Sequence, residues 1–193
     1  VVLGDKVTSE DEITVRGEVI TKETEKIYLI FNKPIGITCT TDLKDKSNII
    51  SYIGYEKRLF PIGRLDKDSS GLILLTDDGD IVNHILRQEN NHEKEYLVRV
   101  NKAIEKDFVK KMTLPMSING TKTKPCKVKV LSKQTFSIIL TQGLNRQIRK
   151  MCLAIGYKVT DLLRFRVIDI QLNNLKVGRW RKLSDIEIHK LKT

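Results

Sequence analysis

The sequence predicts an α+β fold with a largely antiparallel, mixed sheet flanked by helices. Short apolar runs bounded by Gly, Pro and Asp, typical of strands, are interspersed with segments whose apolar residues recur at helical spacing. From residue 27 onward the two kinds of segment follow one another in mixed order, without internal repeats or low-complexity tracts. Such an order favours helices packed on an antiparallel sheet. With 193 residues and a hydrophobic content of 40%, the chain can bury a sizeable core as one domain.

The first 20 residues are expected to form a small β unit of two short strands, at 3–7 and 11–15. Apolar and polar positions alternate there around Gly and Asp. These residues are too few to close a core of their own, and the Lys- and Glu-rich stretch that follows, 21–26, is expected to be a linker. A β extension of the main domain is the alternative. Because the chain opens with Val1 in the middle of this pattern, we expect it to be a fragment.

The main part of the chain has several candidate strands, at 27–31, 37–40, 72–75, 96–100, 126–130, 136–140 and 162–172. Pro34 and Gly36 argue for a turn between the first two, and the fifth and sixth are expected to pair. Helices are expected at 81–86, 104–112 and 183–191. The tripeptide Asp78-Gly79-Asp80 is expected to cap the first of these helices, and Ser184 the last.

A further helix is expected after Gly143. Its apolar residues fall at i, i+3, i+4 and i+7 and form one core-facing stripe: Ile148, Met151, Cys152 and Ile155. Arg149 lies about 100° round the helix from the first residue of this stripe. It is therefore expected to be half buried and able to hold a carboxylate. Arg146 and Lys150 lie near the helix start, where they either face an acidic group or form a solvated surface.

The composition suits a polyanionic partner. Lys and Arg number 35 against 24 Asp and Glu, giving a formal net charge of +11. Binding to phosphates is dominated by the exchange of their counterions for Lys and Arg, although solubility alone also explains such a charge. The three cysteines (Cys39, Cys126 and Cys152) and three scattered histidines suggest neither a disulfide framework nor a zinc site. No apolar run is long enough to span a membrane and no signal peptide is evident, so a cytoplasmic location is expected.

The most distinctive segment is 63–76, Gly-Arg-Leu-Asp-Lys-Asp-Ser-Ser-Gly-Leu-Ile-Leu-Leu-Thr. It places Asp66 shortly after Arg64, followed by a polar turn and by Gly71, which opens an apolar, strand-like run. This composite resembles the catalytic-aspartate segment of the pseudouridine synthases, enzymes that convert uridine in RNA to its C-glycoside isomer. The resemblance implies that Asp66 is the reacting carboxylate.

Two further segments extend the resemblance over the whole chain from residue 27. Residues 92–96, His-Glu-Lys-Glu-Tyr, resemble the segment that supplies the family's active-site tyrosine. Residues 143–151, Gly-Leu-Asn-Arg-Gln-Ile-Arg-Lys-Met, resemble the segment that supplies the basic partner of the aspartate. The chain is similar to the branch of the family that modifies ribosomal RNA and carries an N-terminal S4 RNA-binding domain. Ser69 stands where much of that branch has threonine, so a hydroxyl is kept.

The resemblance implies a domain division and three catalytic residues. Residues 1–24 would be the end of an S4-like domain plus a linker, and residues 25–193 a catalytic domain with the pseudouridine synthase fold. Asp66 would act as nucleophile or covalent partner, at the ribose or at the pyrimidine ring. Tyr96 would stack on the target base and could accept the departing proton; an ordinary packed strand tyrosine is the alternative. Arg149 would pair with Asp66, because burial raises an Asp pKa whereas a guanidinium within roughly 4 to 6 Å lowers it.

The resemblance also implies a set of RNA contacts: Arg64, Leu65, Lys67, Arg146, Gln147, Ile148 and Lys150. Among these, Arg64 would enter the space left when the uridine is extruded from the base stack. Other basic residues are interleaved with aromatic ones. On a strand, Arg164 and Arg166 share one face and Phe165 occupies the other, so the ring is expected in the core. The two arginines, like the lysines of 122–129, either track RNA or are solvated.

The expected partner is RNA, with 23S ribosomal RNA as the main substrate and a tRNA uridine as a second. The protein is expected to be monomeric and to use neither cofactor nor metal, because no phosphate loop, dinucleotide fingerprint or ligand set is present. A noncatalytic RNA-binding or ribosome assembly module is one alternative, but it has no need of Asp66 between Arg64 and Lys67. A glycoside hydrolase is another, and that class requires two cooperating carboxylates.

Overall fold

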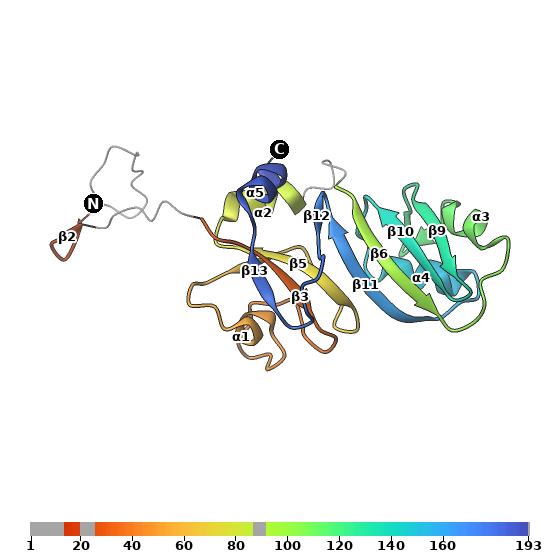
Figure 1. Ribbon diagram of the computed structural model, residues 1–193, viewed down its shortest axis with the longest axis horizontal. Coiled ribbons are helices and arrows are strands. Elements are labelled where there is room, and N and C mark those ends of the chain that lie inside the picture. The colour runs from red at the N-terminus through yellow and green to blue at the C-terminus, as the bar shows by residue number, and fades with distance from the viewer. Residues whose placement is uncertain (1–13, 20–25, 87–91, 193) are drawn as a thin grey trace.

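The computed structural model describes residues 14–19, 26–86 and 92–192 (Figure 1). Its main body is a sheet of nine strands, counted over these residues, with short helices packed on it. The sheet has the order β13-β3-β5-β11-β6-β10-β9, with β4 paired to β5 and β12 paired to β11. Within the described sheet only the β5–β11 pair is parallel. The predicted α+β class with a largely antiparallel sheet is confirmed.

The strands are β1 (Thr14–Val15), β2 (Glu18–Val19), β3 (Tyr28–Lys33), β4 (Phe60–Ile62), β5 (Ser70–Thr76), β6 (Lys94–Val100), β7 (Ser117–Ile118), β8 (Thr121–Lys122), β9 (Lys127–Ser132), β10 (Thr135–Leu140), β11 (Val159–Val167), β12 (Ile170–Gln171) and β13 (Trp180–Lys182). The helices are α1 (Ile49–Ile53), α2 (Gly79–Leu86), α3 (Phe108–Thr113), α4 (Gln147–Ala154) and α5 (Asp185–Lys192).

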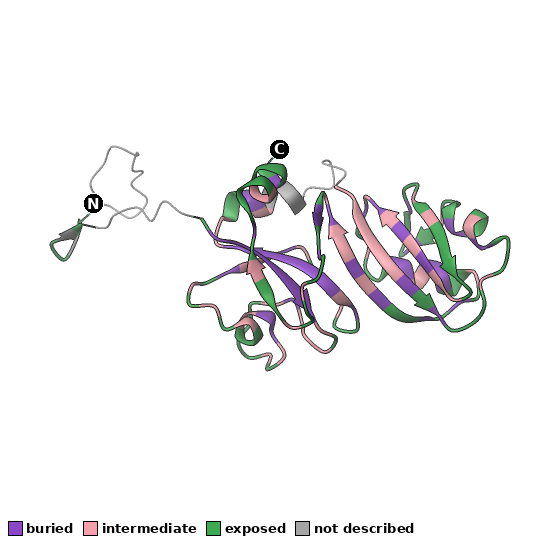
Figure 2. Cartoon of the chain, in the orientation of Figure 1, coloured by how far each residue is buried: buried purple, intermediate pink, exposed green. Residues whose placement is uncertain are grey.

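Strands β3 and β5 form the centre of one half of the molecule and are covered on both faces. On one face, Ile30 and Leu74 belong to the core cluster that includes α2 and α5. On the other face, Leu29 and Ile73 belong to the cluster that includes α1. Figure 2 shows both strands as almost continuously buried. Burial on two faces explains why these strands are continuous apolar runs in the sequence rather than alternating ones.

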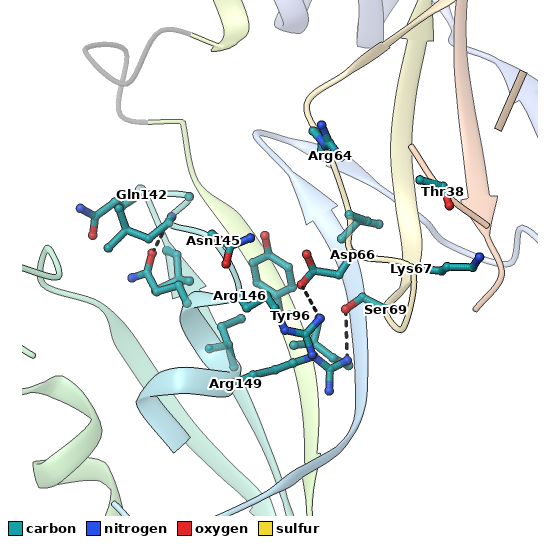
Figure 3. A pocket seen from close by; sticks show the side chains of 17 residues that line it. Thr38, Arg64, Asp66, Lys67, Ser69, Tyr96, Gln142, Asn145, Arg146 and Arg149 are labelled. Carbon is teal, nitrogen blue, oxygen red and sulfur yellow. Dashed lines mark hydrogen bonds and ion pairs between the residues drawn. The ribbon is translucent and has the colours of Figure 1, made fainter. Parts of the chain in front are cut away.

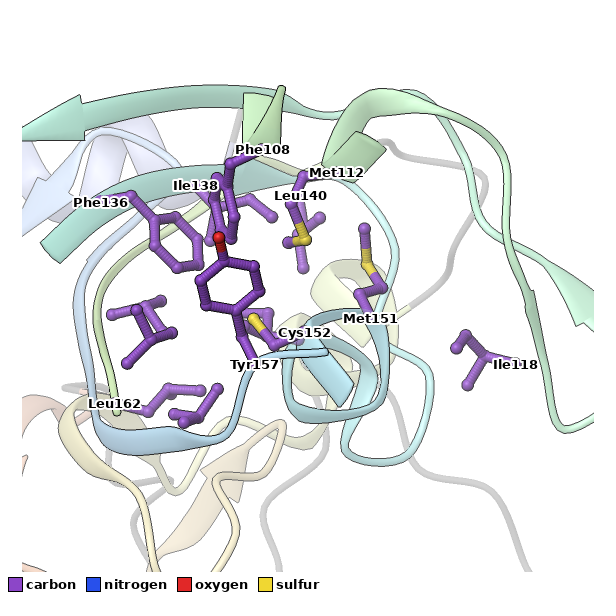
Figure 4. Packing of buried hydrophobic residues seen from close by; sticks show 14 residues of the cluster. Phe108, Met112, Ile118, Phe136, Ile138, Leu140, Met151, Cys152, Tyr157 and Leu162 are labelled. Atoms are coloured by element: carbon purple, nitrogen blue, oxygen red, sulfur yellow. The ribbon is translucent and has the colours of Figure 1, made fainter. Parts of the chain in front are cut away.

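The other half of the molecule has its own core between the sheet and helices α3 and α4 (Figure 4). Phe108 lies at its centre, with its ring centroid 4.9 Å from that of Phe136 and 5.0 Å from that of Tyr157. Such edge-on contacts are favoured geometries for aromatic pairs. Burial raises the pKa of the Cys152 thiol to about 12, so this cysteine is a protonated core residue.

Several predicted elements are confirmed with only small shifts of their ends. The predicted strands 126–130 and 136–140 correspond to β9 and β10, which pair. In α4, three residues of the predicted apolar stripe are buried: Ile148, Met151 and Cys152. At the last helix, the Ser184 hydroxyl accepts from the Glu187 amide and the Glu187 carboxylate accepts from the Ser184 amide. This reciprocal pair is a capping box.

Three predicted elements differ from the structure, and one of them, the strand 162–172, is divided into β11 and β12, which pair with each other. Residues 37–40 form no strand: Thr38 makes only an isolated bridge to Asn48. The reason is the fully buried ammonium of Lys33, which donates to the carbonyls of Pro34 and Ile37, both at 2.9 Å, and so turns the chain away from a straight strand. The predicted helix 104–112 begins only at Phe108 in the structure.

At the N-terminal end, the predicted strand 3–7 lies outside the described residues. Of the predicted strand 11–15, only Thr14–Val15 is described, and it pairs with Glu18–Val19 as the hairpin β1–β2. Across the described part of the chain, no helix combines the length and apolar character needed to cross a membrane.

Candidate active site

A cavity of about 670 Å³ lies between the two halves of the molecule, a size typical of ligand sites. Its walls come from the turn after β4 that contains Asp66, from β6 and β11, and from the loop and helix start that follow β10. Figure 3 shows Asp66, Tyr96 and Arg146 converging on one another. The full lining is Thr38, Arg64, Leu65, Asp66, Lys67, Ser69, Tyr96, Leu140, Gln142, Gly143, Leu144, Asn145, Arg146, Gln147, Ile148, Arg149 and Leu162.

The Asp66 turn, residues 64–69, is held by backbone contacts from three directions. The Ser69 amide donates to the Asp66 carbonyl at 3.0 Å, which closes the turn on itself. The Gly36 amide donates to the Lys67 carbonyl at 2.8 Å. The Leu65 amide donates to the Cys39 sulfur at 3.4 Å, while the Leu65 side chain is buried in the core. These contacts leave the Asp66 side chain at the cavity with 34% of its surface exposed.

Gly71 lets the chain return from this turn into β5 at close range to β11. Its φ is +111°, and a Cβ added there would lie 2.2 Å from the carbonyl oxygen of Arg164. Arg164 is the residue opposite Gly71 in the parallel β5–β11 register. The glycine predicted to open the strand is therefore required both by backbone conformation and by space.

Two arginines from α4 and the residue before it contact the Asp66 turn. Arg146 adopts a left-handed conformation with φ of 54°. It donates two hydrogen bonds to the Asp68 carboxylate, at 2.9 and 2.7 Å, and its Nη1 lies 3.7 Å from Asp66 Oδ2. Arg149, with only 15% of its side chain exposed, donates to the Asp68 carbonyl at 2.7 Å and to the Ser69 hydroxyl at 3.2 Å.

The expected direct pair between Asp66 and Arg149 is therefore not formed. Arg149 contacts Asp68 and Ser69 instead, and Arg146 is the guanidinium beside the Asp66 carboxylate. The physical reason is the left-handed backbone at Arg146, which turns its side chain onto the carboxylates. The hydrogen bonds from Arg146 hold the pKa of Asp68 below its usual range, and Asp68 in turn raises the pKa of Arg146.

Tyr96 projects from β6 and is half-buried, packing against the cores of both halves of the molecule. The start of its strand is fixed by Arg166, which donates to Glu95 at 2.8 Å and to Glu93 at 2.9 Å. Arg166 thus makes structural ion pairs and does not present a free charge to RNA. The β11 register shifts between Arg164 and Arg166, where it pairs with β6.

Arg164, which the strand pattern left open as an RNA contact, is buried with 3% of its surface exposed. Its guanidinium donates to backbone carbonyls inside the protein, so neither of the two alternatives, an RNA contact or a solvated charge, applies to Arg164. Phe165, predicted to be in the core, is partly buried and packs against the cluster that includes α2 and α5. The pattern could not reveal that β11 is covered on both faces at this point.

The remaining predicted RNA contacts differ in their exposure. Arg64 and Lys67 are exposed at the cavity rim, and Lys67 Nζ donates to the Ser47 hydroxyl at 3.1 Å. Gln147 and Ile148 line the cavity wall but are buried. Lys150 donates to Asn119 at 3.1 Å and to Asn145 at 3.0 Å, linking α4 to the turn between β7 and β8.

Sequence reasoning missed Gln142, which lines the cavity and organises its rim. Its side chain accepts from the Lys124 amide at 2.9 Å and donates to the Lys122 carbonyl at 3.3 Å, so it attaches the β7–β8 hairpin to the cavity loop. The only available signal was a polar residue between the apolar β10 run and Gly143. Among the described residues, no group of three or more His, Cys, Asp or Glu side chains is placed to hold a metal ion.

Comparison with known proteins identifies the family of the chain. A family model described as RNA pseudouridylate synthase matches residues 27–154, which include the whole Asp66 turn, Tyr96 and the start of α4. The chain belongs to this family. The three motif segments resemble ribosomal large subunit pseudouridine synthase F in particular.

Curated relatives and a solved structure extend the match. The chain is 49% identical over 188 residues to the dual-specificity RNA pseudouridine synthase RluF of Escherichia coli (strain K12), covering 96% of this chain and 65% of that protein. It is 36% identical to ribosomal large subunit pseudouridine synthase B of Bacillus subtilis (strain 168), covering 98% and 81%. A crystal structure of a pseudouridylate synthase superposes with a TM-score of 0.80 at 33% identity, covering 97% and 83%. The chain thus spans about two thirds of the length of the E. coli relative.

Proposed function

We propose that the chain isomerises uridine to pseudouridine in RNA, with Asp66 as the reacting carboxylate. Family membership supports the reaction class. The observation that carries the assignment is the cavity itself, in which Asp66 is exposed beside Tyr96 and within 3.7 Å of Arg146. A carboxylate that reaches a cavity is placed to act as a nucleophile.

The isomerisation breaks the bond between the ribose and N1 of uracil, turns the base and joins the ribose to C5. Asp66 engages either the ribose or the pyrimidine ring, and the proton then leaves C5. Tyr96 is the proposed stacking partner of the base and acceptor of that proton. A neutral phenol is a poor base in water, so this role of Tyr96 depends on its surroundings. The half-buried cavity assists by limiting the water that would otherwise hydrolyse the broken bond.

Arg64 is the proposed residue that fills the space of the extruded uridine, because it is exposed at the rim two residues before Asp66. Lys67 and Arg146 are proposed to contact phosphates around the cavity. The exposed lysines of β8 and β9 extend this basic surface beyond the rim, and we propose Lys122 and Lys129 as further phosphate contacts.

The proposed substrate is a uridine in 23S ribosomal RNA, with a tRNA uridine as a second substrate. The names of two relatives support this choice, since one is called dual-specificity and the other a large-subunit enzyme. We further propose that residues 1–24 are the end of an S4-like RNA-binding domain and its linker, that residues 25–193 are the catalytic domain, and that the protein acts as a cytoplasmic monomer. The net charge of +11 supports an RNA partner.

The test is tritium release from 5-tritiated uridine in 23S ribosomal RNA and in a tRNA pool, because isomerisation detaches hydrogen from C5 of the base whereas RNA binding does not. Pseudouridine mapping of the treated RNA then identifies the site. The proposal predicts stoichiometric release at one or a few uridines. Binding of both RNAs without any release would support a noncatalytic RNA-binding module instead.

A further inference from the structure

Arg164 on β11 is a buried guanidinium that serves the protein interior. Its Nε donates to the Leu72 carbonyl at 2.8 Å and its Nη1 donates to the Arg64 carbonyl at 3.4 Å. Only 3% of the residue is exposed. Within the described part of the chain, no carboxylate oxygen lies within ion-pair distance of it. A buried charge without a partner is costly, so its retention calls for a specific reason.

The neighbouring charges do not supply that reason. Burial lowers the pKa of Lys33 and of Lys94, and the positive charge of Arg164 lowers both further. Asp66 and Asp68 also act on Lys33, but neither forms an ion pair with Arg164. Arg164 does have two backbone acceptors, and the planar guanidinium group can donate to both at the same time.

Those two acceptors are the two ends of one segment. The chain passes through Arg64, makes the Asp66 turn and returns into β5, where Leu72 is the third residue. The Arg164 side chain thus joins the entry of the turn to its exit. The backbone of Arg164 holds the same segment a second time. Arg164 pairs with Gly71 in the parallel register, and the two backbones lie so close that no side chain fits at position 71.

We propose that Arg164 is a positioning residue that clamps the Asp66 turn, so that Asp66 and Arg64 are held in one arrangement before RNA binds. The proposal rests on the proposed isomerase function. This role differs from those of Arg146 and Arg149, which contact the turn from the cavity side and both meet the Asp68 carboxylate. Preorganisation of this kind matters for rate, since a displacement of about 1 Å in a reacting group can cost about 100-fold.

The experiment compares Arg164→Met and Arg164→Lys with Arg181→Met as the control. Arg181 is another structural arginine, half-buried and bonded to Glu187 at 2.7 Å, but it lies on β13 away from the cavity. Thermal unfolding, RNA affinity and single-turnover tritium release are measured on all three, at a temperature at which each is folded. Hydrogen exchange of the amides in 64–72 reports directly on the turn.

For Arg164→Met we expect a single-turnover rate about 100-fold below wild type, an unchanged RNA affinity and faster exchange in 64–72. Arg164→Lys keeps the charge but cannot bridge both carbonyls, so its rate should fall as well; it also serves if the methionine variant does not fold. Arg181→Met should lose stability without loss of rate or change in the turn. A wild-type rate in folded Arg164→Lys, or equal losses of affinity and rate, would overturn the clamp.

Failure of the proposed function has a different signature. If wild-type protein releases no tritium from any RNA, the isomerase assignment fails. Hydrogen exchange alone then tests whether Arg164 holds the Asp66 turn in place. Faster exchange in 64–72 of Arg164→Met, but not of Arg181→Met, would still support it. Unchanged exchange in that segment would overturn it whatever the activity.

Discussion

Arg146 is the arginine whose guanidinium faces both carboxylates of the acidic turn, Asp66 and Asp68. It reaches Asp68 through two hydrogen bonds and lies 3.7 Å from Asp66. Its hydrogen bonds are the largest cause of the lowered pKa of Asp68. Because this pKa is lower in the folded than in the unfolded protein, the interaction stabilises the fold above the ordinary Asp pKa and is lost as pH falls through the lowered value.

We expect Arg146→Met to return the pKa of Asp68 toward the ordinary value near 3.9 and to slow tritium release about 10-fold or more, since the cation beside Asp66 is gone. The pKa is measured by NMR titration of the Asp68 carboxyl carbon. Lys150→Met is the matched control, because Lys150 bonds only to asparagine oxygens among the contacts described. A lowered Asp68 pKa that survives in Arg146→Met would show that the guanidinium is not its cause.

The candidate site shows which of its features a sequence can reveal. The segments that supply Asp66, Tyr96 and Arg149 could be found, because each combines unusual residues at fixed spacing, and all three residues line one cavity. Their catalytic roles stay predictions. The pairing could not be found, because it depends on the left-handed backbone at Arg146. The burial of Arg164 could not be predicted either, because it depends on strands that are distant in sequence.

At the scale of elements, the apolar pattern predicted those strands and helices whose own apolar residues form the buried face. The prediction of a strand at 37–40 was wrong because the buried side chain of Lys33 binds the carbonyls of Pro34 and Ile37 and so redirects the backbone. Strand β4 was missed because Phe60–Ile62 contains a proline and is only three residues long. The parallel β5–β11 contact that supports the cavity is likewise set by tertiary packing rather than by local sequence.

The substitution Gly71→Ala tests the close contact between β5 and β11. Its Cβ would lie 2.2 Å from a backbone oxygen of β11, and φ of +111° is strained for alanine. Strain and overpacking together should destabilise the fold by about 3 kcal/mol or more, measured by denaturant unfolding. Gly79→Ala at the start of α2 is the control, since nothing lies within 4 Å of its added Cβ and its φ is not positive. Equal stability of the two variants would mean that β5 and β11 are not in close contact.

Helix α5 is docked by an ion pair whose strength depends on pH. The hydrogen bonds from Arg181 lower the pKa of Glu187 to about 2. This stabilisation is present above the unfolded-state pKa of about 4.3 and is lost as pH falls toward 2. Glu187→Gln should therefore cost about 1 kcal/mol or more at pH 7, and little at pH 2. Thermal unfolding of both proteins across this range provides the measurement, and a difference that stays constant with pH would contradict the assignment.

At the scale of the whole molecule, two separately packed halves meet at a basic cavity, and lysines continue the positive surface along β8 and β9. If these lysines contact phosphates, RNA affinity should fall steeply with salt. Lys129→Gln should reduce the slope of log affinity against log salt by roughly 0.7 to 0.9. Lys111→Gln is the control, because Lys111 is already paired with Asp107 at 2.6 Å on α3. Identical slopes for Lys129→Gln and wild type would show that Lys129 on β9 does not contact RNA phosphates.

The central claim is that the Asp66 carboxylate performs the chemistry, and Asp66→Asn tests it most directly. The amide keeps the size of the side chain but removes the reacting charge, and Asp66 has 34% of its side chain exposed, so the fold and most RNA affinity should be retained. The account predicts that tritium release from 5-tritiated uridine in RNA is abolished while the variant still binds that RNA and unfolds like wild type. Near-normal release by folded Asp66→Asn would contradict the account.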